Sequence, residues 1–181
     1  MGPILKLYFK IFLFTGIPFG LISLGFDLLS EESHFAIAYL FRTIFFGFFM
    51  SLTLGTIQIS KLKSYGLKHI TSENLRINQH TSLQSGLSKM DLINKIKSDP
   101  VFQKMTLDET EDGIVLNASM SFWSWGEIIR INIQPLTLDL NEFKIVSSPK
   151  LKIAIIDNGK NYQNVARLKK LIEEGVIEFV K

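Results

Sequence analysis

The sequence predicts an α+β protein: an N-terminal hairpin of two transmembrane helices, followed by a small antiparallel sheet with two helices. Three observations support this fold class. Two apolar runs of about 25 residues each occupy the first third of the 181-residue chain. Several short segments after them alternate apolar and polar residues, as half-buried strands do. Helical patterns stand at the two ends of these segments rather than between them, which is typical of α+β domains.

The two apolar runs are the predicted membrane spans, at residues 5–29 and 35–59. The second run carries a single charge, Arg42, and the first is charged only near its ends. A bilayer core requires about 20 apolar residues in helical form. The alternatives are two buried helices of a soluble protein, or a signal peptide. A signal peptide is disfavoured because the apolar run at residues 5–29 is longer than the roughly 7–15 apolar residues of a signal sequence.

The flanking charges predict an orientation for the hairpin. The connection at residues 27–34 has three acidic residues and no Lys or Arg, whereas residues 60–76 have four basic residues and one acidic residue. Basic flanks stay on the cytoplasmic side of a membrane, and anionic lipid attracts them. We therefore expect cytoplasmic termini, a basic connector at residues 60–76 and a cytoplasmic domain at residues 77–181.

Small residues predict how the two helices pack. Gly16 and Gly20 form one GxxxG pattern, and Gly47, Ser51 and Gly55 follow one another at intervals of four. Small residues let helix backbones approach closely in lipid, where no hydrophobic force drives association. We favour pairing of these stripes within the chain; the alternative is contact with a second copy or another subunit.

Arg42 is a charge about two turns from the outer end of the second run. An intramembrane charge often has a functional role. We favour a side chain that extends outward toward Asp27, Glu31 or Glu32. Pro18 is expected to kink the first helix.

Two helices are predicted in the domain. Ser88, with Asp91 three residues on, is the expected N-cap of the first, which ends at Asp99-Pro100. The second begins after residues 157–161 and ends at Gly175. Their inward faces are expected to hold Leu92, Ile93 and Ile96 in the first helix and Val165, Leu168 and Ile172 in the second.

The strands are predicted from alternation and turns. We expect the first strand to start within residues 69–79 and a hairpin turn to lie at residues 111–113. The strand after this turn is expected to bury Met120 and Phe122. Further extended segments are expected at residues 127–134, 143–147, 150–156 and 176–180.

Residues 157–161 are the first candidate binding site: Asp157, Asn158, Gly159, Lys160 and Asn161. A turn that feeds a helix N-terminus exposes N–H groups that can hold an anion. The structural alternative, which we favour, is a turn with an unusual φ at Gly159 and a helix cap from Asp157 or Asn161.

Trp123 and Trp125 are the second candidate site. They are two residues apart, so they are expected to share one face of a strand or hairpin end, opposite Phe122. Such a pair can contact a membrane interface, a ligand or a protein partner. The alternative is that both tryptophans belong to the core.

Composition excludes several kinds of chemistry. The chain has no cysteine, so it has no disulfide, thiol nucleophile or thiolate metal site. Its three histidines lack metal-ligand spacing, and no nucleotide-binding glycine motif or nucleophile elbow is present. Basic and acidic residues balance at thirteen each in residues 77–181, which disfavours a nucleic-acid interface. The sequence therefore predicts no metal or cofactor and favours a non-enzymatic protein.

Three segments resemble the ending of an uncharacterised family of bacterial domains: Gly126-Glu127, residues 145–150 and residues 156–161 before the last helix. That family has a strand, a Ser-Arg or Ser-x-Pro segment, Asp-x-Gly-x-Asn and a terminal helix. The likeness covers roughly residues 80–175, and Ser148-Pro149 stands where an Arg is common. It implies the fold and a membrane or envelope location, here the bacterial inner membrane, and it brings no catalytic residues.

The functional expectation is a membrane-anchored, non-catalytic protein whose cytoplasmic domain binds a protein partner or helps assemble a membrane complex. Self-association through the hairpin is a further form of this expectation, and membrane lipid is an expected contact. The alternative is a module at the inner leaflet that binds a lipid or another small ligand.

Overall fold

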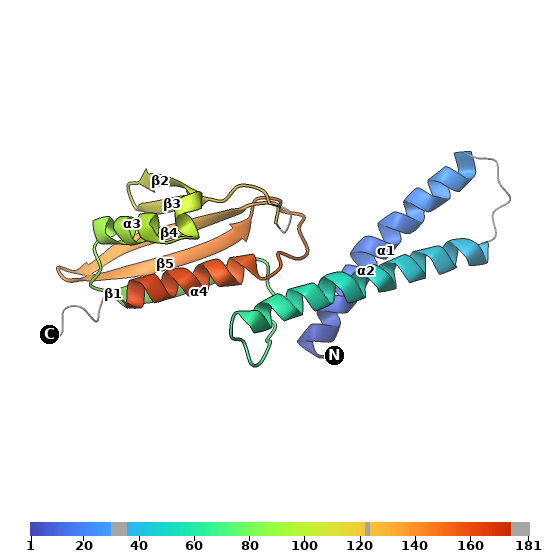
Figure 1. Cartoon of the computed structure of the whole chain (residues 1–181), viewed down its shortest axis with the longest axis horizontal. Helices are drawn as coiled ribbons and strands as arrows, with labels where there is room; N and C mark the ends of the chain where they lie inside the picture. The colour runs from blue at the N-terminus through green and yellow to red at the C-terminus, as the bar shows by residue number, and fades with distance from the viewer. Residues whose placement is uncertain (30–35, 122–123, 175–181) are drawn as a thin grey trace. The chain divides into compact units, whose positions relative to one another are not determined.

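The computed structural model describes residues 1–29, 36–121 and 124–174 (Figure 1). The chain divides into two compact units, Met1–Leu75 and Arg76–Lys181, and each is described separately below. The first unit is a helical hairpin and the second is an antiparallel five-stranded sheet with helices, so the predicted α+β class is confirmed.

Two long helices make up the first unit: α1 (Pro3–Leu29) and α2 (Ala36–Ser64). Both are long and apolar enough to cross a membrane, and α1 continues through Pro18 as one helix. Helix α2 extends past the predicted span and is followed by Gly66, whose φ of 91° suits the turn that ends it. Only 17% of the most apolar window of α1 and 11% of that of α2 are buried, so most of their apolar surface faces outward.

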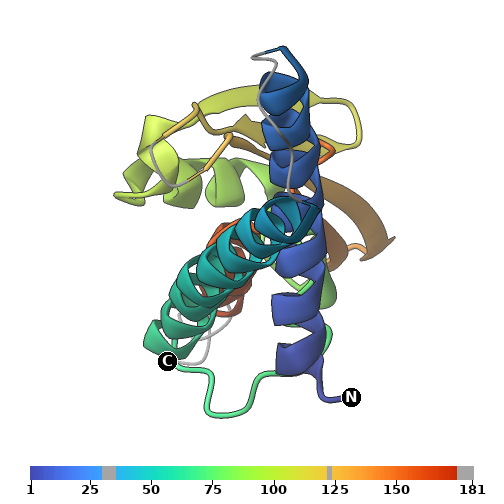
Figure 2. The same ribbon diagram turned by 90° about the vertical axis from the view of Figure 1, so that its right-hand side faces the viewer.

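The two helices of the hairpin cross one another (Figure 2). Glycines lie where their backbones come closest. A Cβ atom built on Gly16 would lie 3.1 Å from Gly47 Cα and 3.1 Å from the Thr43 carbonyl oxygen. One built on Gly20 would meet the side chain of Thr43. The two backbones are therefore so close at Gly16 and Gly20 that a larger side chain would not fit there without moving the helices apart.

The same interface continues along α2 at Ser51 and Gly55. The Ser51 hydroxyl donates a hydrogen bond of 2.6 Å to the Tyr8 carbonyl, and Gly55 lies against the Tyr8 ring. The Tyr8 and Thr56 hydroxyls are 3.0 Å apart. All five predicted small residues thus lie between α1 and α2 of one chain, which is the arrangement favoured from the sequence.

Arg42 makes an ion pair across the hairpin. Its guanidinium lies 3.0 Å from the Asp27 carboxylate and also donates to the Ser23 hydroxyl at 3.3 Å. The predicted partner Asp27 is therefore in contact with it, while Glu31 and Glu32 lie outside the described residues.

The second unit contains an antiparallel sheet in the order β1-β5-β4-β3-β2. Strands β2 to β5 follow one another as a meander, while β1 pairs with β5 at one edge. The strands are β1 (Gln79–Ser85), β2 (Thr106–Thr110), β3 (Gly113–Asn117), β4 (Glu127–Thr137) and β5 (Leu140–Pro149).

One face of the sheet forms the core. Ile114, Ile131 and Ile145 stand side by side on three adjacent strands because the register pairs them directly. Helices α3 (Lys89–Ser98) and α4 (Lys160–Glu173) both pack on this face, and their predicted apolar faces are buried in one cluster with it. A short 3₁₀ turn, η1 (Phe102–Lys104), adds Phe102 to the same cluster.

The start of α3 agrees in detail with the sequence. The Ser88 hydroxyl accepts the amide hydrogen of Asp91 at 3.1 Å, and it also donates to the Asp91 carboxylate at 2.6 Å. These bonds satisfy one of the free amides of the first turn. The end of α4 near Gly175 and the expected tail at residues 176–180 lie outside the described residues.

Two strand predictions were wrong. Met120 is 67% exposed, because β3 stops at Asn117, opposite the first residue of β2, and the chain then leaves the sheet. Residues 150–156 form turns, because Pro149 pairs with the first residue of β4 and no strand extends further. The first strand starts at Gln79, the last residue of the range predicted for its start, and Phe122 lies outside the described residues.

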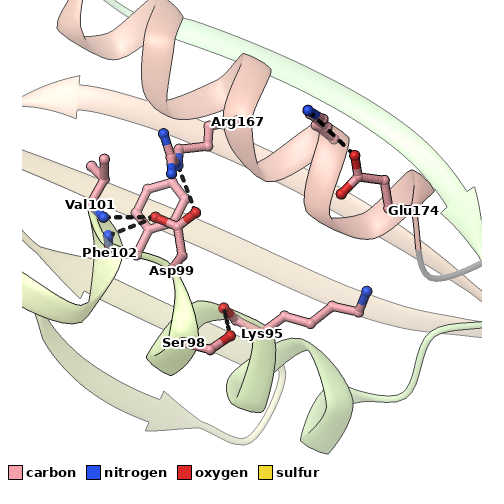
Figure 3. Close-up of polar contacts among 8 residues, drawn as sticks. Lys95, Ser98, Asp99, Val101, Phe102, Arg167 and Glu174 are labelled. Carbon is pink, nitrogen blue, oxygen red and sulfur yellow. Dashed lines mark hydrogen bonds and ion pairs between the residues drawn. The ribbon is translucent and has the colours of Figure 1, made fainter.

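An ion pair links the end of α3 to α4 (Figure 3). Arg167 donates through Nε to one oxygen of Asp99 at 2.6 Å, and the amides of Val101 and Phe102 donate to the other oxygen at 2.8 and 3.1 Å. Burial raises the pKa of Asp99, but these hydrogen bonds and the nearby charge outweigh it, so the pKa lies below its ordinary value.

We expect Gly16→Leu to separate the two helices. The new side chain meets backbone on α2, and overpacking of this kind costs about 1–3 kcal/mol. Because the chain lacks cysteine, spin labels on cysteines introduced at the exposed positions Phe14 and Phe49 would measure the separation of the two helices in micelles. Gly25→Leu is the matched control, since nothing lies within 4 Å of its Cβ position. Equal distances in the two variants would contradict the packing described here.

We expect Asp99→Asn to lower the free energy of unfolding near pH 7 by about 1–3 kcal/mol, because an ionised, buried hydrogen-bond acceptor is lost. A lowered pKa stabilises the fold above the unfolded pKa of about 3.9, and this stabilisation disappears as pH falls through the lower folded value. The difference between wild type and variant should therefore stay constant above about pH 5 and shrink in acid.

The measurement for Asp99→Asn is denaturant unfolding of the full chain in micelles, followed by tryptophan fluorescence. Both tryptophans belong to the second unit, so the signal reports on it alone. Glu173→Gln is the control, because its ion pair with Lys169 is exposed and worth little. If the free energies of unfolding of the wild type and Asp99→Asn differed by the same amount at neutral and acid pH, the lowered pKa of Asp99 would be refuted.

Candidate functional site

The face of the sheet opposite the core carries the candidate site. Along β4 and β5 the residues between the core positions point to this other face, which both helices of the unit leave uncovered. Arg130 of β4 is paired in register with Val146 of β5, and Ile128 is paired with Ser148. Cationic, apolar and hydroxyl side chains therefore alternate on adjacent strands near the end of the sheet where β4 begins.

A groove of about 510 Å³ lies over these residues. Its volume falls within the range of sites for small ligands, about 300–1,000 Å³. The segment before β1 and the turn after β5 both contribute residues to its lining. Its lining consists of Ile77, Asn78, Ile128, Arg130, Val146, Ser148, Pro149, Lys150 and Lys152.

The charges of the groove are all of one sign. Arg130, Lys150 and Lys152 line it, no acidic residue does, and no described carboxylate forms an ion pair with any of the three. The whole domain is balanced in charge, so these cations form a local positive site. Arg and Lys at the rim of an apolar groove can hold a phosphate or carboxylate.

Two loops meet beside the groove. The β3–β4 loop at residues 118–126 is tied to the turn after β5 by a hydrogen bond of 2.9 Å from the Lys150 amide to the Gly126 carbonyl. Gly126 has a φ of 81°, and a Cβ there would lie 2.8 Å from the Ala118 carbonyl oxygen. Only glycine therefore fits this closely packed turn.

These loops present apolar side chains to solvent. Met120, Trp125 and Ile153 are 67%, 58% and 80% exposed. They stand on the same two loops that supply or adjoin Lys150 and Lys152. We call these three residues the apolar loop tips. Trp125 is therefore outside the core, while Trp123 lies outside the described residues.

The predicted site at residues 157–161 is mostly buried. Asp157 accepts hydrogen bonds from the amides of Gly159 and Asn161 and from the Asn161 side chain, at 2.8–3.0 Å. Gly159 adopts a φ of 70°, as expected for the turn, and Asn158 also has a positive φ of 52°. The Asp157 carboxylate therefore occupies the first amides of α4, where an anion would otherwise bind.

Asn161 extends this network into the sheet. It is fully buried and accepts a hydrogen bond of 2.6 Å from the Ser147 hydroxyl, which Asn164 also contacts at 3.3 Å. The turn thus connects α4 to β5. Lys160 is only partly buried, at the first position of α4. A ligand role for residues 157–161 stays a prediction.

The groove cations were missed by sequence reasoning. The alternation of β4 placed Arg130 outward, but Lys150 and Lys152 appeared to belong to a further strand. Their convergence depends on the end of β5 at Pro149 and on its pairing with β4. The sequence signal for this site was weak: Arg130 on the exposed face of a strand, and Lys150 and Lys152 after Pro149.

No family model, curated protein or solved structure matches the chain. The resemblance to a bacterial domain family therefore rests on the short motifs quoted above. The fold and the groove define a class in structural terms: an α+β domain with one open, locally cationic sheet face, joined to a helical hairpin with two possible membrane spans.

Proposed function

We propose that the protein is a membrane-anchored binding module, with α1 and α2 in the bilayer and the α+β domain at its cytoplasmic surface. The observation that carries this proposal is the apolar surface of the hairpin. Ten large apolar side chains of α1 from Ile4 to Leu29, and eight of α2 from Ile37 to Leu52, are exposed. Soluble proteins rarely expose apolar patches of more than a few hundred Å².

The charges of the hairpin support this location. The Arg42–Asp27 pair stands toward the end of the hairpin that joins α1 to α2, and ion pairing lowers the cost of placing such charges near a bilayer. Lys61 and Lys63 lie in the last turn of α2. Basic flanks on one side and an acidic connection on the other favour cytoplasmic termini in a bacterial inner membrane.

A binding role, rather than catalysis, fits the groove. Its lining combines three cations with apolar side chains, and Ser148, its only hydroxyl, has no His or acidic neighbour within the lining. A His or a carboxylate is the usual group that orients or deprotonates a serine nucleophile, and the lining provides neither. The chemistry of the groove therefore favours holding an anionic ligand without transforming it.

We expect the full chain to remain in the membrane fraction after an alkaline carbonate wash. A tag at the C-terminus should be protected from protease in intact cells. Phe48→Lys should reduce the inserted fraction, because a charge near the centre of a span costs about 2.5–3.5 kcal/mol.

Met90→Lys is the matched control for Phe48→Lys. Met90 is similarly exposed, at 63% against 59% for Phe48, but it belongs to α3. Release of the wild-type chain by the alkaline wash would rule out the anchor. Cleavage of the tag in intact cells would rule out the orientation.

A protein partner is the second candidate, and the tip of the β4–β5 hairpin favours it. Leu136 and Leu138 are 46% and 103% exposed, at the opposite end of β4 from Trp125. Exposed leucines on a projecting hairpin are a suitable anchor for a partner. The expected assembly of a membrane complex would use this tip.

We expect a photo-crosslinker at Leu138 to give one discrete adduct in native membranes, lost when Leu136→Ser is added. Leu138 lies in the turn between β4 and β5, and its side chain is fully exposed and outside the core cluster. The label should therefore leave folding intact. A crosslinker at the exposed Asn94 of α3 is the control. Identical adducts at both positions, or none at Leu138, would exclude partner docking at the tip.

A further inference from the structure

We infer that the groove binds the headgroup of an anionic phospholipid, and that the apolar loop tips enter the adjoining bilayer surface. This inference rests on the proposed membrane anchor and specifies the ligand of the binding module. Three independent features of the second unit carry it: the charge of the groove, the mixed character of its lining and the apolar side chains beside it.

The charge of the groove selects an anion. Arg130, Lys150 and Lys152 reach it from one strand and one turn, with no acidic residue in the lining. The three cations are exposed and have no described ion-pair partner, so their charge is available to a ligand. Guanidinium and ammonium groups together are well suited to a phosphate diester.

The apolar part of the lining selects an amphiphile over a free ion. Ile77, Ile128, Val146 and Pro149 contribute carbon surface between the cations. Inorganic phosphate gains nothing from such surface, whereas the glycerol and first methylenes of a lipid bury area against it. The volume of about 510 Å³ is also larger than a phosphate ion requires.

The loop tips connect the groove to a bilayer. Trp125 precedes Gly126, whose carbonyl accepts the Lys150 amide at 2.9 Å, and Ile153 directly follows Lys152. Tryptophan prefers the level of the headgroups, with its ring between water and hydrocarbon. Exposed Trp, Met and Ile beside Lys are the combination that binds an anionic membrane surface.

The test uses the full chain in nanodiscs of phosphatidylcholine, with Trp123→Phe so that Trp125 is the only tryptophan. Phosphatidylglycerol with brominated acyl chains is added, because bromine quenches nearby tryptophan. We expect stronger quenching of Trp125 than the same mole fraction of brominated phosphatidylcholine produces. Inorganic phosphate, compared with chloride at equal ionic strength, should not relieve this quenching.

The groove variant is Arg130→Gln, Lys150→Gln and Lys152→Gln combined. Since each basic residue near a membrane strengthens binding about fivefold, loss of all three should weaken the response to phosphatidylglycerol by about a hundredfold. Lys152→Gln alone, at an exposed turn position, should give about a fivefold shift if the triple variant does not fold. The control has the same charge change at Lys95, Lys97 and Lys104, beside the covered face of the sheet.

The outcomes separate this inference from the proposed anchor. Equal shifts in the two triple variants, or equal quenching by the two brominated lipids, would overturn the headgroup site while leaving the anchor intact. Relief of quenching by inorganic phosphate would assign the groove to free phosphate and overturn a lipid ligand. A chain that fails to enter nanodiscs and is also washed from membranes would instead refute the anchor.

Discussion

The close contact between α1 and α2 at Gly16 and Gly47 sets the main constraint on this molecule. Each helix contacts the other through a narrow stripe of small residues, and most of its phenylalanines, leucines and isoleucines are left exposed. A pair of helices has too little mutual surface to cover them. Their apolar exterior requires apolar surroundings, and the proposed bilayer meets this requirement without any further protein.

The second unit buries its apolar side chains within itself, between a sheet and two helices. Five strands bury one face under α3 and α4, where Ile114, Ile131 and Ile145 form a continuous row. The Asp99–Arg167 pair joins the end of α3 to α4, and the Asn161 side chain ties α4 to Ser147 of β5. With its stability secured on one side, the sheet has a second face free for a ligand, and the groove lies there.

Local sequence signals predicted the elements whose causes are local. Ser88 caps α3 because its hydroxyl reaches an amide three residues away, and Gly159 takes a positive φ within its own turn. The apolar runs identified both long helices for the same reason, since length and hydropathy are properties of a continuous segment. The wrong predictions fall where a strand depends on a distant partner. Met120 continues the alternation of β3, but β2 provides nothing to pair with it.

The sequence alone determined that the chain begins with two helices of membrane-spanning length, that they carry matching small-residue stripes, and that an α+β domain without cysteine follows. These properties arise from residue type and short-range spacing. Only the tertiary structure decided that Arg130 lies beside Lys150 and Lys152, that Asp157 occupies the start of α4, and that Trp125 is exposed. Strand register brings residues together from distant parts of a chain, and no local pattern specifies which strand will pair with which.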